Sequence, residues 1–131
     1  MGNFVVAFGR FAPACLALAA CTTTTGYAGE EYVASFNEPF ISFASEGATL
    51  LRTSPEDLRG TMLAAARERR GDRVRFTGLH AGRPFELTII REPCADSMSG
   101  FAFSHTAVLV EGDAAPLEGC ARFASEEQPH E

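Results

Sequence analysis

Hydrophobic and polar residues alternate along much of the chain between residues 30 and 124, a pattern typical of strands with one buried face. Residues 74–77 alternate in this way, and so do Phe85, Leu87 and Ile89 with the polar residues between them. Short Gly-containing segments separate such runs and favour turns. The pattern therefore predicts a series of antiparallel strands. The predicted strands cover residues 32–36, 40–45, 48–52, 74–77, 85–89, 101–110 and 117–123.

The longest predicted strand, residues 101–110, has two faces of different polarity. Its odd positions are the more apolar, and His105 is one of them. We therefore expect His105 in the core, with a ring nitrogen bonded to a backbone group or a carboxylate. Ser104 is its neighbour in sequence, and adjacent strand residues point to opposite faces. The alternation thus predicts that the Ser104 hydroxyl does not contact the His105 imidazole.

Residues 54–70 give conflicting signals. Ser54 and Pro55 form a good helix start, and the arginines before Gly71 suit a helix C-terminus. Local rules alone favour a helix over residues 55–70. Gly60 opposes a helix there, and Arg70-Gly71-Asp72 leads into a clear strand in the manner of a hairpin turn. The residue pattern leaves helix and strand both open.

The first 21 residues read as an export signal. Arg10 precedes an apolar run over residues 11–20, which is too short to span a bilayer. The run ends in Leu18-Ala19-Ala20-Cys21, a lipobox that resembles the precursor of a bacterial lipoprotein. We expect a lipoprotein signal peptide at 1–20, lipidated Cys21 and a flexible tether at 21–29, one β domain at 30–124 and a disordered tail at 125–131. The alternatives are an ordinary signal peptide cut near Ala20 and an uncut helical anchor.

Export leaves Cys94 and Cys120 as an even pair, since Cys15 lies in the leader and Cys21 takes lipid. An oxidising compartment favours a disulfide between them, worth about 3–4 kcal/mol for a loop of this length. A metal site made from these cysteines and the histidines is the alternative, but the spacing matches no ligand motif. We therefore predict one disulfide, no metal and no cofactor.

Charge and composition exclude some classes of function. Seventeen acidic residues and ten of the eleven basic residues follow Cys21, so the exported chain carries a net charge of about −7. This balance argues against nucleic acid as a partner. Every basic residue other than histidine is an arginine, so chemistry that needs a lysine amine is excluded.

Two motifs carry a resemblance to a known family. Asn37-Glu38-Pro39-Phe40 is followed by Cys94-Ala95-Asp96-Ser97-Met98-Ser99 and then by Gly119-Cys120-Ala121. The set resembles a family of uncharacterised bacterial envelope proteins, usually described as predicted membrane proteins or lipoproteins. The likeness covers residues 36–122. The chain departs from the family pattern at Phe36, where glycine is usual, and at Ile41, where tryptophan is usual.

The resemblance implies an antiparallel β architecture and decides the conflicting segment. We predict an all-β fold, a small antiparallel β-barrel or sandwich-like meander with one disulfide. A strand within residues 61–68 is expected to pair with residues 74–79, and any helix to be a turn at 55–59. No activity comes with the family.

The motif residues are candidates for a binding or structural role. We expect Asp96 and Ser97 to bond nearby backbone N–H groups in an Asx- or Ser-type turn, and Met98 to pack into an irregular gap against aromatic residues. Ser99 belongs to the same candidate motif. Phe40, after Pro39, is expected to anchor the sheet. Glu38 is expected to pair with an arginine or to accept backbone hydrogen bonds.

These expectations describe a lipid-anchored envelope protein that is not an enzyme and that either binds a protein, a cell-wall component or a small ligand or has a structural role in the envelope. Its predicted place is the periplasmic face of the outer membrane, where the cell has one. One alternative is an inhibitor of a cationic enzyme such as lysozyme. Another is a serine hydrolase using Ser97 or Ser99 with His105 and Asp96, although no G-x-S-x-G turn is present. A third is a carrier that holds a small molecule inside a barrel.

Overall fold

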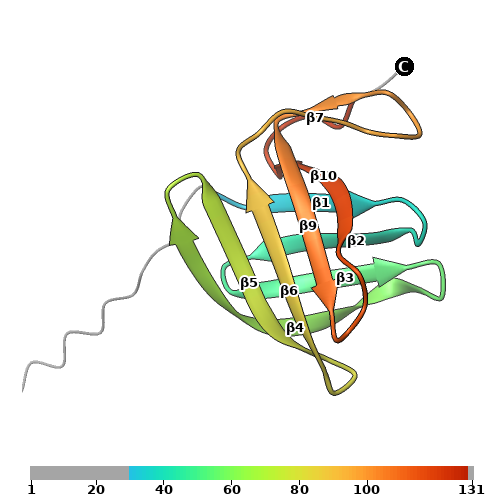
Figure 1. Cartoon of the computed structure of the whole chain (residues 1–131), viewed down its shortest axis with the longest axis vertical. Helices are drawn as coiled ribbons and strands as arrows, with labels where there is room; N and C mark the ends of the chain where they lie inside the picture. The colour runs from blue at the N-terminus through green and yellow to red at the C-terminus, as the bar shows by residue number, and fades with distance from the viewer. Residues whose placement is uncertain (1–29, 130–131) are drawn as a thin grey trace, which may run out of the picture.

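The computed structural model describes residues 30–129, which fold into a closed antiparallel β-barrel (Figure 1). Each barrel strand pairs with the strands before and after it in the order β1-β2-β3-β4-β5-β6-β9-β10, and β10 pairs back with β1. The all-β barrel prediction is confirmed. The barrel strands are β1 (Tyr32–Phe36), β2 (Ile41–Glu46), β3 (Thr49–Ser54), β4 (Asp57–Arg70), β5 (Arg73–His80), β6 (Arg83–Ile90), β9 (His105–Glu111) and β10 (Leu117–Phe123).

The connection from β6 to β9 carries a second, two-stranded sheet. It consists of β7 (Cys94–Ala95) and β8 (Ala102–Phe103), which lie outside the barrel wall (Figure 1). The prediction of one continuous strand over residues 101–110 is therefore wrong. A bend at Ser104 separates β8 from β9 and breaks the alternation that was assumed to run through it.

The disputed segment is a strand, as the family resemblance implied, and residues 30–129 contain no helix. β4 is 14 residues long because both of its sides are paired: Leu63 lies opposite Leu50 of β3, and Arg67 lies opposite Phe76 of β5. Gly60 adopts a φ of +85° near the irregular register between β3 and β4, a conformation that glycine accepts without strain. The local helix signals were overridden by pairing on both edges.

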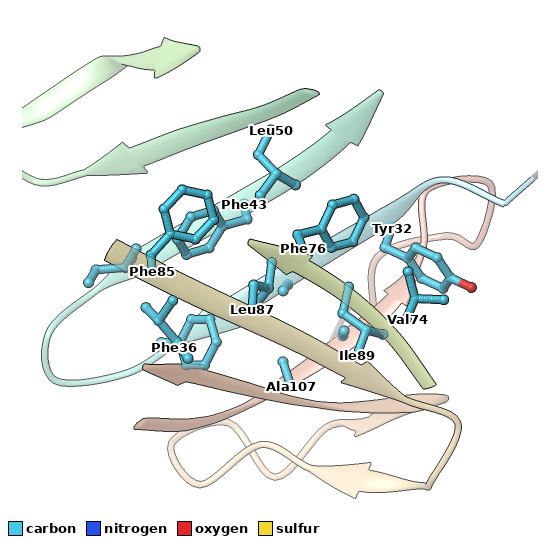
Figure 2. Packing of buried hydrophobic residues seen from close by; sticks show 14 of the residues in the cluster. Tyr32, Phe36, Phe43, Leu50, Val74, Phe76, Phe85, Leu87, Ile89 and Ala107 are labelled. Atoms are coloured by element: carbon cyan, nitrogen blue, oxygen red, sulfur yellow. The ribbon is translucent and has the colours of Figure 1, made fainter. Parts of the chain in front are cut away.

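Large apolar side chains fill the middle of the barrel. The rings of Phe43 and Phe85 meet there from opposite walls, with their centroids 6.4 Å apart (Figure 2). Phe36, on the strand next to that of Phe43, lies with its ring centroid 6.3 Å from the Phe43 centroid. Leu50, Leu87 and other fully buried residues pack around them. An eight-stranded barrel is just wide enough for its side chains to fill it.

The up-and-down order gives the barrel two distinct ends. The chain enters at one end, called here the entry end, which is formed by residues 30–31, 46–48, 71–72 and 124–129. The other end, called the far end, is formed by residues 37–40, 55–56, 81–82 and 112–116. Any tether attached before residue 30 therefore reaches the domain at the entry end.

Candidate functional site

The structure brings the two sequence motifs together. Asn37 lies in the turn after β1, and its Nδ2 donates hydrogen bonds to Asp96 Oδ1 at 2.7 Å and to Ser97 Oγ at 3.3 Å. These residues are 59 and 60 positions apart in the chain. The motifs are thus two halves of one local structure, called here the motif junction and comprising Asn37 and residues 96–100.

Asp96 organises the loop between β7 and β8. Its Oδ2 accepts hydrogen bonds from the Ser99 hydroxyl and the Ser99 N–H, both at 2.7 Å, and from the Met98 N–H at 3.2 Å. The Ser99 hydroxyl, followed by the Ser99 N–H and Asn37, lowers the pKa of Asp96 below its usual value, because each bond favours the ionised carboxylate. The predicted turn is confirmed for Asp96, whereas within residues 30–129 the Ser97 hydroxyl accepts from the Asn37 side chain and from no backbone N–H.

We expect Asp96→Asn to lower the free energy of unfolding by about 1 kcal/mol at pH 7, because hydrogen bonds to a charged acceptor are lost near the surface. A carboxylate with a lowered folded-state pKa stabilises the fold above the unfolded pKa of about 3.9 and loses this contribution as pH falls through its folded pKa. The difference between wild type and variant should therefore shrink below about pH 4. Urea unfolding at pH 7 and in acid measures it.

Asp113→Asn is the matched control, because Asp113 is exposed in the turn between β9 and β10. Its effect should stay within about 0.5 kcal/mol at both pH values. A wild-type-to-variant gap at Asp96 that persists unchanged in acid would contradict the proposed role of the ionised carboxylate.

The disulfide is present and fastens the outer sheet to the barrel. Cys94 of β7 is bonded to Cys120 of β10, with their Cα atoms 5.6 Å apart. Cys120 is buried between the barrel wall and the covering segment. The bond therefore holds the loop that contains Asp96 against β10, which is next to β1 and the Asn37 turn.

Two motif residues lie on the surface, contrary to prediction. The side chain of Phe40 is 52% exposed and that of Met98 is 62% exposed. The inward series of β2 runs through Ile41 and Phe43, so a residue one position earlier faces out. Met98 lies at the tip of the Asp96 loop, beyond reach of the barrel interior. The sheet anchor is Ile41 and not Phe40.

Glu38 and Pro39 shape the turn between β1 and β2. Their shared peptide bond is cis, and Glu38 adopts a φ of +47°. Glu38 is exposed and makes no hydrogen bond or ion pair within residues 30–129, so its expected pairing with an arginine or with backbone N–H groups is not found. Pro39 lines a hollow at the far end.

Ser104 and His105 do contact each other, which the strand alternation had ruled out. Ser104 Oγ lies 2.7 Å from His105 Nδ1, and also 2.9 Å from both carboxylate oxygens of Glu126. The bend at Ser104 turns its side chain toward the imidazole. The partner of His105 is thus a hydroxyl that in turn bonds a carboxylate.

This contact is not arranged to activate a nucleophile. In a catalytic triad the imidazole lies between hydroxyl and carboxylate, whereas here the carboxylate bonds the hydroxyl directly. His105 is buried against the rings of Tyr32 and Phe123. Burial lowers the pKa of His105, against the opposing charge of Glu126, so the imidazole is neutral at pH 7. The arrangement fastens residue 126, within the predicted tail, to the barrel.

A charged layer at the far end was missed by the sequence reading. It consists of Arg52, His80 and Glu111, which face the barrel interior at the ends of β3, β5 and β9. A signal was present, because Arg52 follows Leu50, and Glu111 follows Leu109, on the inward side of each strand. A charge that ends an apolar face marks the rim of a barrel.

Other potential sites can be described only within residues 30–129. There, no three His, Cys, Asp or Glu side chains converge to hold a metal ion. The same residues include no helix of a length and hydrophobicity that would cross a membrane. Cys21, the predicted lipidation site, lies outside them. Comparison with protein-family models, with curated proteins and with solved structures finds no match to this chain.

Proposed function

We propose that this chain is a lipid-anchored protein of the bacterial cell envelope, that its role is binding and not catalysis, and that it meets its partner through the far end of the barrel. The lipobox supports the anchor. The chain enters the barrel beside Arg67 and Arg69, which bond Glu30, and this supports an attachment at the entry end. The far end then points away from the membrane.

The choice of this binding surface rests on one observation. Phe40 and Leu58 are large apolar side chains with 52% and 82% exposure, and both line one groove of about 440 Å³ at the far end. Grouped exposed apolar side chains mark interaction sites, since a soluble surface rarely keeps them without a use. The groove runs between the turn after β1 and the turn after β3.

Charge beside this groove selects the kind of partner. Glu38 and Glu56 are exposed in the two turns that border it, and the exported chain as a whole is acidic. The surface therefore suits a protein that offers an apolar side chain within a cationic surround. A cationic envelope-directed enzyme such as lysozyme has this chemistry, so inhibition of one is the second candidate function.

The anchor is tested with the full chain and its Cys21→Ser variant. We expect the wild-type protein in the membrane fraction, with the mass of a chain that lacks residues 1–20 and carries lipid. The variant should be released from the membrane, because the acylated thiol is lost. An intact mass that retains Met1 in the wild-type protein would contradict the proposal.

The binding surface is tested by placing a photo-crosslinking residue at Phe40, at Leu58 and, as control, at exposed Arg73 near the entry end. Discrete protein adducts are expected at the first two positions and none at the third. Phe40→Ser with Leu58→Ser should abolish the adducts seen with a probe at Glu56. Equal adducts at all positions would reject the far end as the surface, and titration of lysozyme activity separates the second candidate.

A further inference from the structure

The two ends of the barrel are built from similar charged side chains but are paired very differently. At the entry end, Arg67 is only 2% exposed, and its guanidinium donates to the carbonyl oxygens of Gly47 at 2.9 Å and Glu30 at 2.5 Å and to Glu31 at 3.4 Å. Glu31 in turn accepts bonds from the Ser45 hydroxyl and the Gly47 N–H. This end is closed by a well-bonded polar layer.

The far end lacks such pairing. The side chain of Arg52 is 14% exposed, yet its buried Nε has no hydrogen-bond partner, and its Nη2 reaches Glu111 only at 3.4 Å. His80 Nδ1 lies 3.9 Å from the other oxygen of the Glu111 carboxylate. Buried donors in folded proteins are nearly always paired, so the Arg52 guanidinium keeps donor capacity that the other residues of 30–129 do not use.

A second arginine approaches the same opening. Gly112, at φ +53°, leaves the space that the Arg83 guanidinium occupies, because a Cβ on residue 112 would lie 2.8 Å from Arg83 Nη2. Arg52 and Arg83 both line a hollow of about 340 Å³ with Glu111. Among the residues that line the hollow, the guanidiniums of Arg52 and Arg83 face the single carboxylate of Glu111, an excess of one positive charge.

The remaining wall of the hollow is apolar. Ile41, Leu109 and Leu117 line it on the side of the packed core. At the roughly 30 Å³ that a water molecule takes in the liquid, the hollow has room for about ten non-hydrogen atoms. Apolar walls with a few convergent polar groups are the usual composition of a small-molecule site.

We propose that the far-end hollow binds a small monocarboxylate with an apolar body. The carboxylate accepts hydrogen bonds from the Arg52 and Arg83 guanidiniums and balances the single excess charge, while the apolar body lies against Ile41, Leu109 and Leu117. The site goes beyond the proposed function, because it requires neither lipid on Cys21 nor a protein on the Phe40 groove.

The test uses the three isoleucines of the chain, Ile41, Ile89 and Ile90, as methyl probes in NMR spectra of the purified full chain. Titration with 3-phenylpropanoate should shift the Ile41 methyl in a saturable way and leave Ile89, which is buried between Val74 and Ala107, in place. The neutral 3-phenylpropanamide should bind at least about tenfold more weakly, since a charge-assisted bond is lost. Equal binding of acid and amide would overturn the proposal.

Arg83→Gln and Arg52→Met should each weaken 3-phenylpropanoate binding at least about tenfold. Arg83 is exposed, so its variant does not endanger the fold, and unchanged Ile89 and Ile90 methyl signals verify folding of the Arg52 variant. Arg73→Gln, at the opposite end, is the control and should bind as wild type. Weakening by the control to the same degree, or no Ile41 shift with any acid, would overturn the site.

Two further probes identify the source of the carboxylate. N-acetylphenylalanine imitates the C-terminal residue of a peptide, and tighter binding of this probe than of 3-phenylpropanoate would assign the site to a peptide C-terminus. Tighter binding of 3-phenylpropanoate would assign it to a free small acid. Both results support the monocarboxylate site, whereas tighter binding of inorganic phosphate than of either acid would overturn it.

Discussion

Replacing Cys94 and Cys120 together by alanine is expected to lower the free energy of unfolding by about 3–4 kcal/mol. The disulfide closes a loop with a sequence separation of 26 residues, and removing it restores that conformational freedom to the unfolded chain. A loss of this size is a large fraction of the stability of a typical domain. Urea unfolding of wild type and double variant, under oxidising conditions, measures the difference.

The same variant should loosen the segment that carries Asp96 before the barrel as a whole unfolds. β7 and β8 pair over only two residues each, so the disulfide is their main attachment to β10. Amide hydrogen exchange should accelerate in residues 91–104 far more than in β5 and β6. Wild type treated with reductant is the control and should match the variant. A stability loss below about 1 kcal/mol would mean that the barrel closure alone orders this segment.

Seven of the eight barrel strands were predictable from alternation, and the β1 and β10 bounds agree with the prediction to the residue. β4 was predicted only through the family resemblance. The predictions made from alternation were wrong where the local backbone geometry changes. Phe40 was assigned to the sheet although the inward series begins at Ile41, and one residue of error reverses a side chain. Ser104 was treated as a strand residue, and no sequence rule located its bend. Loop geometry at both places depends on contacts that are distant in sequence.

The motif junction was recognisable only in part. The Asp96 turn follows from Asx chemistry between close neighbours, which a sequence displays directly. The bond from Asn37 joins residues 59 positions apart, so it could not be derived from spacing. The charged layers at the barrel ends depend on strand pairing in the same way, because Arg67 of β4 meets Glu31 only when β1, β2, β3 and β4 lie side by side.

Arg67→Met is expected to lower the free energy of unfolding by about 2–4 kcal/mol, because removing a buried guanidinium leaves its partly buried partners without compensation. The carbonyl oxygens of Gly47 and Glu30 lose a donor, and Glu31 loses its cation. Methionine keeps most of the volume between the rings of Tyr32 and Phe76, over which the guanidinium lies at 5.7 and 5.2 Å. The loss therefore reports on charge and hydrogen bonding more than on packing.

The environment of Glu31 keeps the expected loss of unfolding free energy below the largest values known for a broken buried ion pair. Burial alone would raise the pKa of Glu31, but the bonds from Ser45 and Gly47 and the charge of Arg67 together lower it. Two of these three contributions remain after the substitution, and the carboxylate keeps partial contact with water. The carboxylate therefore stays ionised near neutral pH in the variant, with fewer partners.

Arg69→Met is the matched control, because Arg69 is two residues away on the same strand and pairs with Glu30 at the surface. A surface pair is worth about 1 kcal/mol or less, so this variant should unfold close to wild type. Combining Arg67→Met with Glu31→Gln should restore part of the loss, since the unpaired carboxylate is removed as well. Strictly additive losses in that double variant would show that Arg67 acts through the backbone carbonyls, and equal losses at positions 67 and 69 would show that the entry end is not closed by a buried pair.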